Sequence, residues 1–217
     1  MDAPRAAKDL VRAGYDTISE AYRGDTFALE GSAYERPVVA VQRRVPAGGR
    51  VLDLGCGCGV PVAERLAADF DVTGVDFSSR QIARARSLVP GATFIQADLT
   101  EVELPGASFD AVVSFYAIIH IPLEEQAALF DAIAGWLRPG GVLCASLGHR
   151  AWTGSEDDWH GAPMYWSHGD RAMYASWLLE RGFRIDEEWF IPEDDGGHAA
   201  FLATLTASPA AGRLGGS

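Results

Sequence analysis

The sequence has few cysteines, no long hydrophobic run and little positive charge, and each shortage excludes a class of protein. Two of its three cysteines, Cys56 and Cys58, share one short turn, which is neither a disulfide framework nor a complete metal site. We therefore expect a reduced, cytoplasmic protein that binds no metal. No apolar run approaches the length of a membrane span, and the charged first ten residues do not resemble a signal peptide, so we expect no membrane association.

Basic side chains are outnumbered, with 18 Lys and Arg against 30 Asp and Glu and a formal net charge of −12. Because a phosphate backbone attracts a basic surface, this balance argues against a nucleic-acid partner. Three arginines recur on one predicted helix, and we interpret Arg80, Arg84 and Arg86 as its solvated face. The length of 217 residues and the 48% of hydrophobic residues are typical of one globular domain.

The most informative segment that is present is Val51–Gly59, an apolar strand that ends in a turn with three alternating glycines. A second apolar run, Val72–Val75, ends in the acidic residue Asp76. Glycines let a backbone turn sharply and approach a ligand, and a carboxylate accepts both hydroxyls of a ribose. The pattern predicts a nucleoside-binding half-domain. A dinucleotide fingerprint needs a further glycine at position 60, where Val60 stands, so NAD is the weaker alternative.

Helices and strands are expected to alternate along most of the chain, which predicts a parallel sheet with helices on both faces. Helices are expected at 5–23, 32–45, 61–68, 79–88, 122–137 and 170–182, and strands at 51–54, 72–75, 93–96, 111–115, 142–147, 184–191 and 199–205. A short loop joins the last two strands and favours an antiparallel pair. The segment Gly148–Gly169 shows no such pattern, and we expect a long loop there.

Five motifs in this order resemble those of the class I S-adenosylmethionine (SAM)-dependent methyltransferases, of the small-molecule type. They are Val51–Gly59, Gly74–Ser78, Gln96–Leu99, Phe109–Ser114 and Leu137–Gly141. The resemblance implies an α/β, Rossmann-like three-layer sandwich with a seven-stranded, mostly parallel sheet of order 3-2-1-4-5-7-6, its seventh strand antiparallel. It further implies one domain over residues 1–207, with an N-terminal helical lid at 1–46 and an acceptor-site insertion at 148–169. We expect residues 208–217 to be a flexible tail.

The same resemblance implies SAM as cofactor, S-adenosylhomocysteine as product, and roles for single residues. Gly55, Cys56 and Gly57 would lie against the methionine part of SAM, with Asp53 near its ammonium group. Asp76 would accept the ribose hydroxyls, beside Phe77 and Ser78. Asp98 and Leu99 would bind the adenine edge, and Phe115 and Tyr116 would lie along the cofactor. In related enzymes a first helix covers the cofactor, and Tyr15 resembles a lid tyrosine that reaches the SAM carboxylate.

Residues for the acceptor follow the predicted fourth and fifth strands. His120 stands near the carboxyl end of a strand, where open α/β sheets bind ligands, and is the candidate base or orienting residue; a scaffold role stays open. The segment Gly148–Gly169 is rich in aromatic side chains, and four of them are expected to form an acceptor pocket: Trp152, Trp159, Tyr165 and Trp166. Acidic residues nearby, among them Glu193, would also suit a cationic acceptor, by charge and by cation–π contact.

The sequence therefore predicts a SAM-dependent methyltransferase that acts on an O, N or C atom of a small organic molecule, such as a specialised metabolite. Alternatives keep the SAM site but change the chemistry, as in a decarboxylase or cyclase, or lose catalysis, as in a regulatory subunit. We expect a monomer or homodimer.

Overall fold

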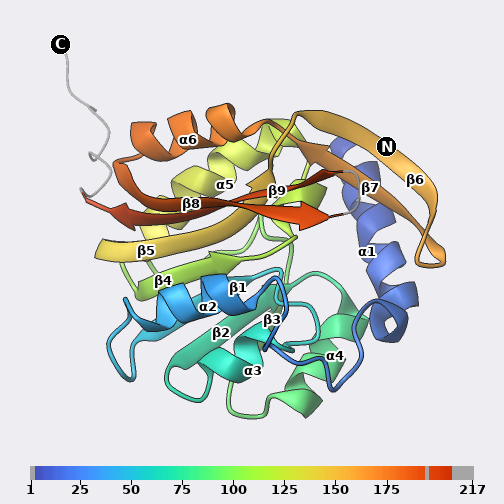
Figure 1. The fold of residues 1–217 in the computed structure, drawn as a ribbon. Coiled ribbons are helices and arrows are strands. Elements are labelled where there is room, and N and C mark those ends of the chain that lie inside the picture. The colour runs from blue at the N-terminus through green and yellow to red at the C-terminus, as the bar shows by residue number, and fades with distance from the viewer. Residues whose placement is uncertain (1–2, 194–195, 207–217) are drawn as a thin grey trace.

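The computed structural model describes residues 3–193 and 196–206, and the predicted flexible tail at 208–217 lies outside them (Figure 1). A seven-stranded sheet has the order β3-β2-β1-β4-β5-β9-β8. The strands are β1 (Arg50–Leu54), β2 (Asp71–Asp76), β3 (Thr93–Gln96), β4 (Phe109–Ser114), β5 (Leu137–Gly148), β8 (Phe183–Glu193) and β9 (Gly196–Leu205). The first five run parallel, and β9 is antiparallel to both of its neighbours. This confirms the expected fold class and strand order.

Side chains alternate between the two faces of the sheet and build two separate cores. Successive residues of one strand show it: Val51 packs in one cluster, whereas Leu52 and Leu54 pack in the other. Helices α5 (Leu123–Trp136) and α6 (Arg171–Glu180) cover one face, and α2 (Glu35–Gln42), α3 (Val62–Leu66) and α4 (Ser79–Leu88) cover the other (Figure 1). The three layers leave the carboxyl ends of the parallel strands free at one edge.

The segment predicted as a long loop is instead a β-hairpin of β6 (Trp152–Trp159) and β7 (Ala162–His168). Its turn residues, His160 and Gly161, both have positive φ, as a tight two-residue hairpin turn requires. His-Gly is a weaker turn signal than Asn-Gly or Asp-Gly, and the first strand is mostly exposed and polar. The first strand therefore lacks the alternation of apolar and polar residues that predicts a strand, and the sequence did not predict the hairpin.

The hairpin packs against the first helix, α1 (Ala3–Tyr22), beside the edge of the sheet where the parallel strands end (Figure 1). Val11 and Ile18 of α1 form a small core with Ala162 and Met164 of β7. A Cβ at Gly14 would lie 2.8 Å from the carbonyl oxygen of Pro163, so only glycine permits this approach. Helix α1 and the hairpin together cover the edge of the sheet where the parallel strands end.

No helix among residues 3–193 and 196–206 is long and apolar enough to cross a membrane. The remaining short element of the chain, the 3-10 helix η1 (Ile118–His120), directly follows β4 and brings His120 to the covered edge.

Candidate active site

A cavity under α1 begins at the predicted glycine turn after β1. Gly55 has φ +74°, and a Cβ there would lie 2.1 Å from the Cβ of Ala117. Gly57, with φ +55°, is also in the left-handed region. Both glycines line the cavity, so the turn exposes bare backbone where a ligand can lie against it. This is the geometry that the glycine pattern predicts.

Asp53 is a buried carboxyl group that lacks a hydrogen-bond partner on one of its oxygens. Its side chain is 2% exposed, and Oδ2 has no hydrogen-bond partner among the described residues. Burial, together with the negative charge of Asp76, raises the pKa of Asp53 to about 8. A buried carboxyl without a partner is costly unless a donor arrives from outside the chain. Because Asp53 lines the cavity, a bound cation such as an ammonium group would fit it.

Asp76 stands at the end of β2 and is held by backbone groups. Its two oxygens accept from the N–H of Gly57 at 3.0 Å and of Ser78 at 2.9 Å. Burial raises its pKa to about 6, against the lowering effect of these bonds. Each carboxylate oxygen of Asp76 can accept a second hydrogen bond, so both oxygens can still accept from hydroxyl groups in the cavity.

Ser78 does not line the cavity, in contrast to the expected cofactor contact. Its Oγ accepts from the N–H of Gln81 at 3.1 Å and donates to Asp16 of α1 at 2.6 Å. Ser78 thus caps α4, as its position before the helix predicts, and ties α1 to it.

Asp98, expected at the adenine edge, lines the cavity beside Leu99. Its carboxylate is 2.8 Å from Nζ of Lys8 on α1 and accepts from the side chain and backbone of Thr100. Burial raises the pKa of Asp98, but these hydrogen bonds outweigh it and hold the pKa below its ordinary value. Helix α1 therefore reaches Asp98 through Lys8, a residue that the sequence patterns did not reveal.

Arg23, directly after α1, is a half-buried cation that lines the same cavity. Its guanidinium lies over the rings of Phe27, Tyr34 and Tyr22 at 4.0, 4.9 and 5.0 Å from the centroids. It donates to the hydroxyl of Tyr34 at 2.6 Å. In the described part of the chain no carboxylate pairs with it, although an arginine so placed binds a planar anion well.

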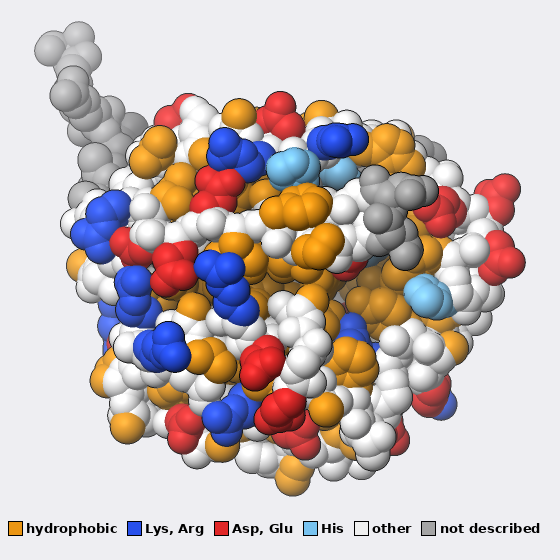
Figure 2. Space-filling view, viewed as in Figure 1, with side chains coloured by type: hydrophobic (Ala, Val, Ile, Leu, Met, Phe, Trp, Pro, Cys, Tyr) orange, Lys and Arg blue, Asp and Glu red, His pale blue; other side chains and the backbone are white. Residues whose placement is uncertain are grey.

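A second, larger hollow of about 1240 Å³ adjoins this cavity. It is lined by three tryptophans, Trp152, Trp159 and Trp166, and by all five histidines of the sequence. Figure 2 shows hydrophobic side chains in a hollow of this face, with histidine at its rim. Phe27, Trp152 and Phe190, three of the four large hydrophobic side chains exposed in the described structure, lie in this hollow. Exposed apolar groups gathered in one place indicate a binding site.

His120 stands between the two compartments with both ring nitrogens bonded. Nδ1 lies 2.7 Å from the carbonyl oxygen of Tyr165, which can only accept, so Nδ1 carries the proton. Nε2 therefore accepts from the hydroxyl of Tyr15, 3.0 Å away. Burial lowers the pKa of His120 to about 4, against the raising effect of the Tyr165 bond. The neutral imidazole keeps its lone pair on Nε2, at the boundary.

Tyr116 is held at this boundary by an uncommon backbone conformation. Its φ is +59°, and its N–H donates to Oγ of Ser146 at 2.7 Å. Its ring lies 5.1 Å from that of His198, which in turn bonds Glu193 at 3.1 Å. Strained residues of this kind cluster at functional sites. The hairpin of β8 and β9 thus contributes to the hollow, which sequence reasoning missed except for the charge of Glu193.

The structure brings most of the predicted site residues together. The cavity is lined by Tyr15, Asp53, Gly55, Cys56, Gly57, Asp76, Phe77, Asp98, Leu99, Phe115, Tyr116 and His120. The hollow is lined by Trp152, Trp159, Trp166 and His120, whereas Tyr165 contributes its carbonyl to His120 and does not line the hollow. Besides His198 of β9, the residues not predicted are Lys8 on α1 and Arg23 just after it, because no motif marks them.

The fold, the bare glycine turn and Asp76 at the end of β2 together are typical of an α/β protein that binds a nucleoside. A family model described as a methyltransferase domain matches residues 51–141. Over 194 residues the chain is 32% identical to a probable S-adenosylmethionine-dependent methyltransferase of Mycolicibacterium smegmatis, and the match covers 88% of this chain and 70% of the relative. The chain belongs to the SAM-dependent methyltransferases, and SAM is its cofactor. The unpaired Asp53 and the bare glycine turn fit that cofactor.

Solved structures support the fold. A 1,6-didemethyltoxoflavin-N1-methyltransferase from Burkholderia thailandensis superposes with a TM-score of 0.70 at 18% identity, covering 95% of this chain and 92% of the other. The (4+2) cyclase SpnF superposes with a TM-score of 0.68 at 18% identity, covering 88% and 94%. At such identities the likeness concerns the fold and not the reaction.

Proposed function

We propose that this protein transfers the methyl group of SAM, by in-line displacement, to a small organic acceptor bound in the hollow beside His120. The observation that carries the proposal is two ionisable groups without an ionic partner in one cavity. Asp53 is a buried carboxyl group and Arg23 a half-buried cation, and neither pairs with the other or with a further charge in the described residues. Such unpaired groups are costly, so a ligand that brings an ammonium group to Asp53 and a carboxylate to Arg23 is favoured.

The methionine end of SAM supplies these two counter-charges. Its ammonium group would donate to Asp53, and its carboxylate would accept from the guanidinium of Arg23. Tyr15, expected at that carboxylate, bonds His120 instead, so we assign the carboxylate to Arg23. Asp76 would take the ribose hydroxyls, and Asp98 with Leu99 the adenine edge.

Five residues line both the cavity and the hollow and so form the boundary that the methyl group would cross: Tyr15, Tyr22, Tyr34, Tyr116 and His120. In-line transfer depends on alignment of donor and acceptor more than on acid–base chemistry. We propose that residues 1–46 act as a lid over SAM, that the hairpin within residues 148–169 walls the acceptor site, and that both belong to one domain over residues 1–207.

His120 suits the orientation of an acceptor better than strong base catalysis. Nδ1–H donates to a backbone carbonyl and not to a carboxylate, so no charge stabilises a protonated ring. An acceptor N–H or O–H could replace the Tyr15 hydroxyl on Nε2. This favours acceptors that lose their proton readily, such as amines, aromatic ring N–H groups and phenols, over aliphatic alcohols. The aromatic walls of the hollow favour a planar molecule.

The test is incubation of the protein with methyl-labelled SAM and small-molecule extracts of the source organism. We expect release of S-adenosylhomocysteine together with a product that carries the label and that, with unlabelled SAM, is about 14 mass units heavier than its precursor, the mass of one added CH2. The Asp76→Ala variant should reduce both signals at low SAM concentrations. SAM binding without either signal on any extract would contradict the proposal and favour the regulatory role.

A second candidate is a non-methyl reaction in the same hollow, such as a cyclisation. The weak basicity of His120 favours it, because such a ring is a poor base for deprotonating a methyl acceptor. A product of unchanged mass, formed without release of S-adenosylhomocysteine, would identify that chemistry in the same incubation.

A further inference from the structure

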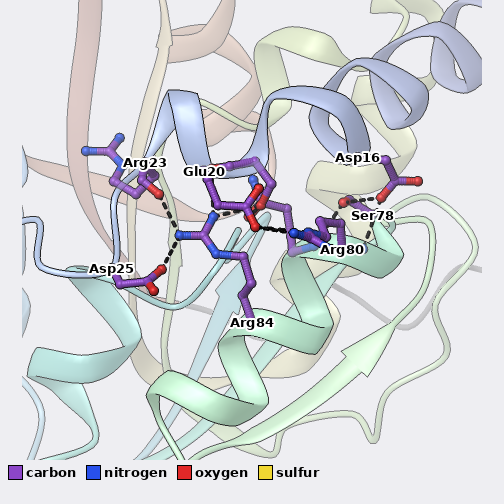
Figure 3. Close-up of polar contacts among 9 residues, drawn as sticks. Asp16, Glu20, Arg23, Asp25, Ser78, Arg80 and Arg84 are labelled. Carbon is purple, nitrogen blue, oxygen red and sulfur yellow. Dashed lines mark hydrogen bonds and ion pairs between the residues drawn. The ribbon is translucent and has the colours of Figure 1, made fainter.

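Arg84 of α4 makes a set of contacts that a solvated arginine does not make. Sequence reasoning placed it on a solvated face with Arg80 and Arg86, and for Arg84 this was wrong: its side chain is 11% exposed, against 56% for Arg80. Figure 3 shows its guanidinium reaching from α4 to the chain at the end of α1. The two arginines differ in exposure because the side chain of Arg84 points to the end of the lid helix.

The guanidinium of Arg84 binds carbonyl groups at the end of α1 and just beyond it. Nη1 donates to the carbonyl oxygen of Ser19 at 2.6 Å and to its Oγ at 2.7 Å. Nη2 donates to the carbonyl oxygen of Arg23 at 2.6 Å and to Asp25 at 2.5 Å. The Ser19 carbonyl also accepts from the N–H of Arg23 at 3.2 Å, so Arg84 adds a second bond there, and a cation at this end of a helix opposes the helix dipole.

One of these carbonyls belongs to Arg23, whose side chain enters the cavity. Arg84 holds the backbone of Arg23 from outside, while Tyr34 and Phe27 hold its guanidinium from inside. We propose that Arg84 is a positioning residue that aims Arg23 at the carboxylate of SAM. This rests on the proposed function, because it takes Arg23 as the carboxylate partner.

The alternative is that Arg84 merely fastens the lid. Arg80, four residues earlier on α4, provides the matched control, since it also bridges to α1. It pairs with Glu20 through its side chain and makes no contact with the backbone at Arg23. If fastening were the role, both arginines would affect every ligand of the cavity alike.

The experiment measures the Kd of two ligands, S-adenosylhomocysteine and 5′-methylthioadenosine, which lacks the amino-acid end. We expect Arg84→Gln to weaken S-adenosylhomocysteine about tenfold and 5′-methylthioadenosine less than about twofold. Arg80→Gln should leave both within about twofold. The double variant with Arg23→Gln should be no weaker than Arg23→Gln alone, because the two residues act in series.

Other outcomes separate the hypotheses. Equal weakening of both ligands by Arg84→Gln, or no weakening of either, would overturn the positioning role. Unchanged S-adenosylhomocysteine binding by Arg23→Gln would instead overturn the carboxylate assignment on which it rests. If Arg84→Gln does not fold, Arg84→Lys replaces it, because one ammonium cannot hold both carbonyls in the planar geometry of a guanidinium; the same selective loss is then expected, at a smaller size.

Discussion

The cavity and the hollow present different chemical groups. The cavity contains two ionisable groups without ionic partners, Asp53 and Arg23, beside the exposed backbone of the glycine turn. The hollow relies on ring faces and on imidazoles, with Trp159 and Trp166 around His120. The two compartments thus differ in kind: the cavity presents a few ionisable groups at fixed positions, whereas the hollow presents ring surfaces and imidazole groups.

The largest effect is expected at Asp53. Replacement by Asn removes the anion that the ammonium group of SAM requires, so the Kd of S-adenosylhomocysteine should rise about 30-fold, the scale of a charge-assisted hydrogen bond. Calorimetric titration measures it. Unchanged affinity of the Asn variant would place the ammonium elsewhere and break the account of the cavity.

The same variant should make the ligand-free protein more stable at pH 8. Burial raises the pKa of Asp53 in the folded state far above its unfolded value, so the folded state binds the extra proton. Stability therefore falls as the pH rises from about 4 towards about 8. Asp53→Asn should flatten this fall in thermal unfolding between pH 5 and pH 8. If Asp53→Asn showed the same pH dependence of stability as the wild type, ionisation of Asp53 would not lower the free energy of unfolding.

At Asp76, replacement by Ala should weaken S-adenosylhomocysteine about tenfold, because the ribose hydroxyls lose their acceptor. The loss should extend to 5′-methylthioadenosine, which keeps the ribose but lacks the amino-acid end. That pattern distinguishes Asp76 from Asp53, whose replacement should spare the truncated ligand. Equal behaviour of the two variants would contradict the separate subsites.

His120→Gln should lower turnover of the acceptor about fivefold and leave the Kd of S-adenosylhomocysteine unchanged. The amide keeps the volume and polarity of the site but lacks the lone pair of the ring nitrogen. Steady-state kinetics with the labelled product, together with cofactor titration, measure both values. Wild-type turnover would remove His120 from the reaction.

The smallest effect is expected at Trp159, whose ring contacts the rings of His120 and Tyr15. Trp159→Phe should raise the KM for the acceptor about threefold with kcat and cofactor affinity preserved, because part of a stacking surface is lost. A change in cofactor affinity larger than the change in KM would show that the hairpin contributes to cofactor binding, which would contradict the division between cavity and hollow.

The fold and the donor side could be predicted because their signals are local. Strand, glycine turn and acid follow each other within Val51–Asp76, and backbone geometry ties each residue type to its place. Gly55 shows the link most clearly, since positive φ and the contact with Ala117 both exclude a side chain.

The remaining residues could not be predicted because their partners are distant in sequence. Arg84 is 61 residues away from Arg23 in the sequence, and the two residues come into contact only when α1 packs on α4. The hairpin of β6 and β7 lacks an apolar face of its own in its first strand and forms against α1. His198 joins the hollow only when β9 pairs with β5. Such tertiary placement leaves no periodic pattern in the chain.

The central claim is that Asp53 is a largely protonated acid in the ligand-free protein and loses its proton when the ammonium group of SAM binds. With a pKa of about 8, it is mostly protonated at pH 7 in the free protein. Calorimetry of S-adenosylhomocysteine binding at pH 7, in two buffers of different ionisation enthalpy, should show that the wild type releases protons on binding and that Asp53→Asn releases markedly fewer. Equal proton release by both proteins would contradict the account.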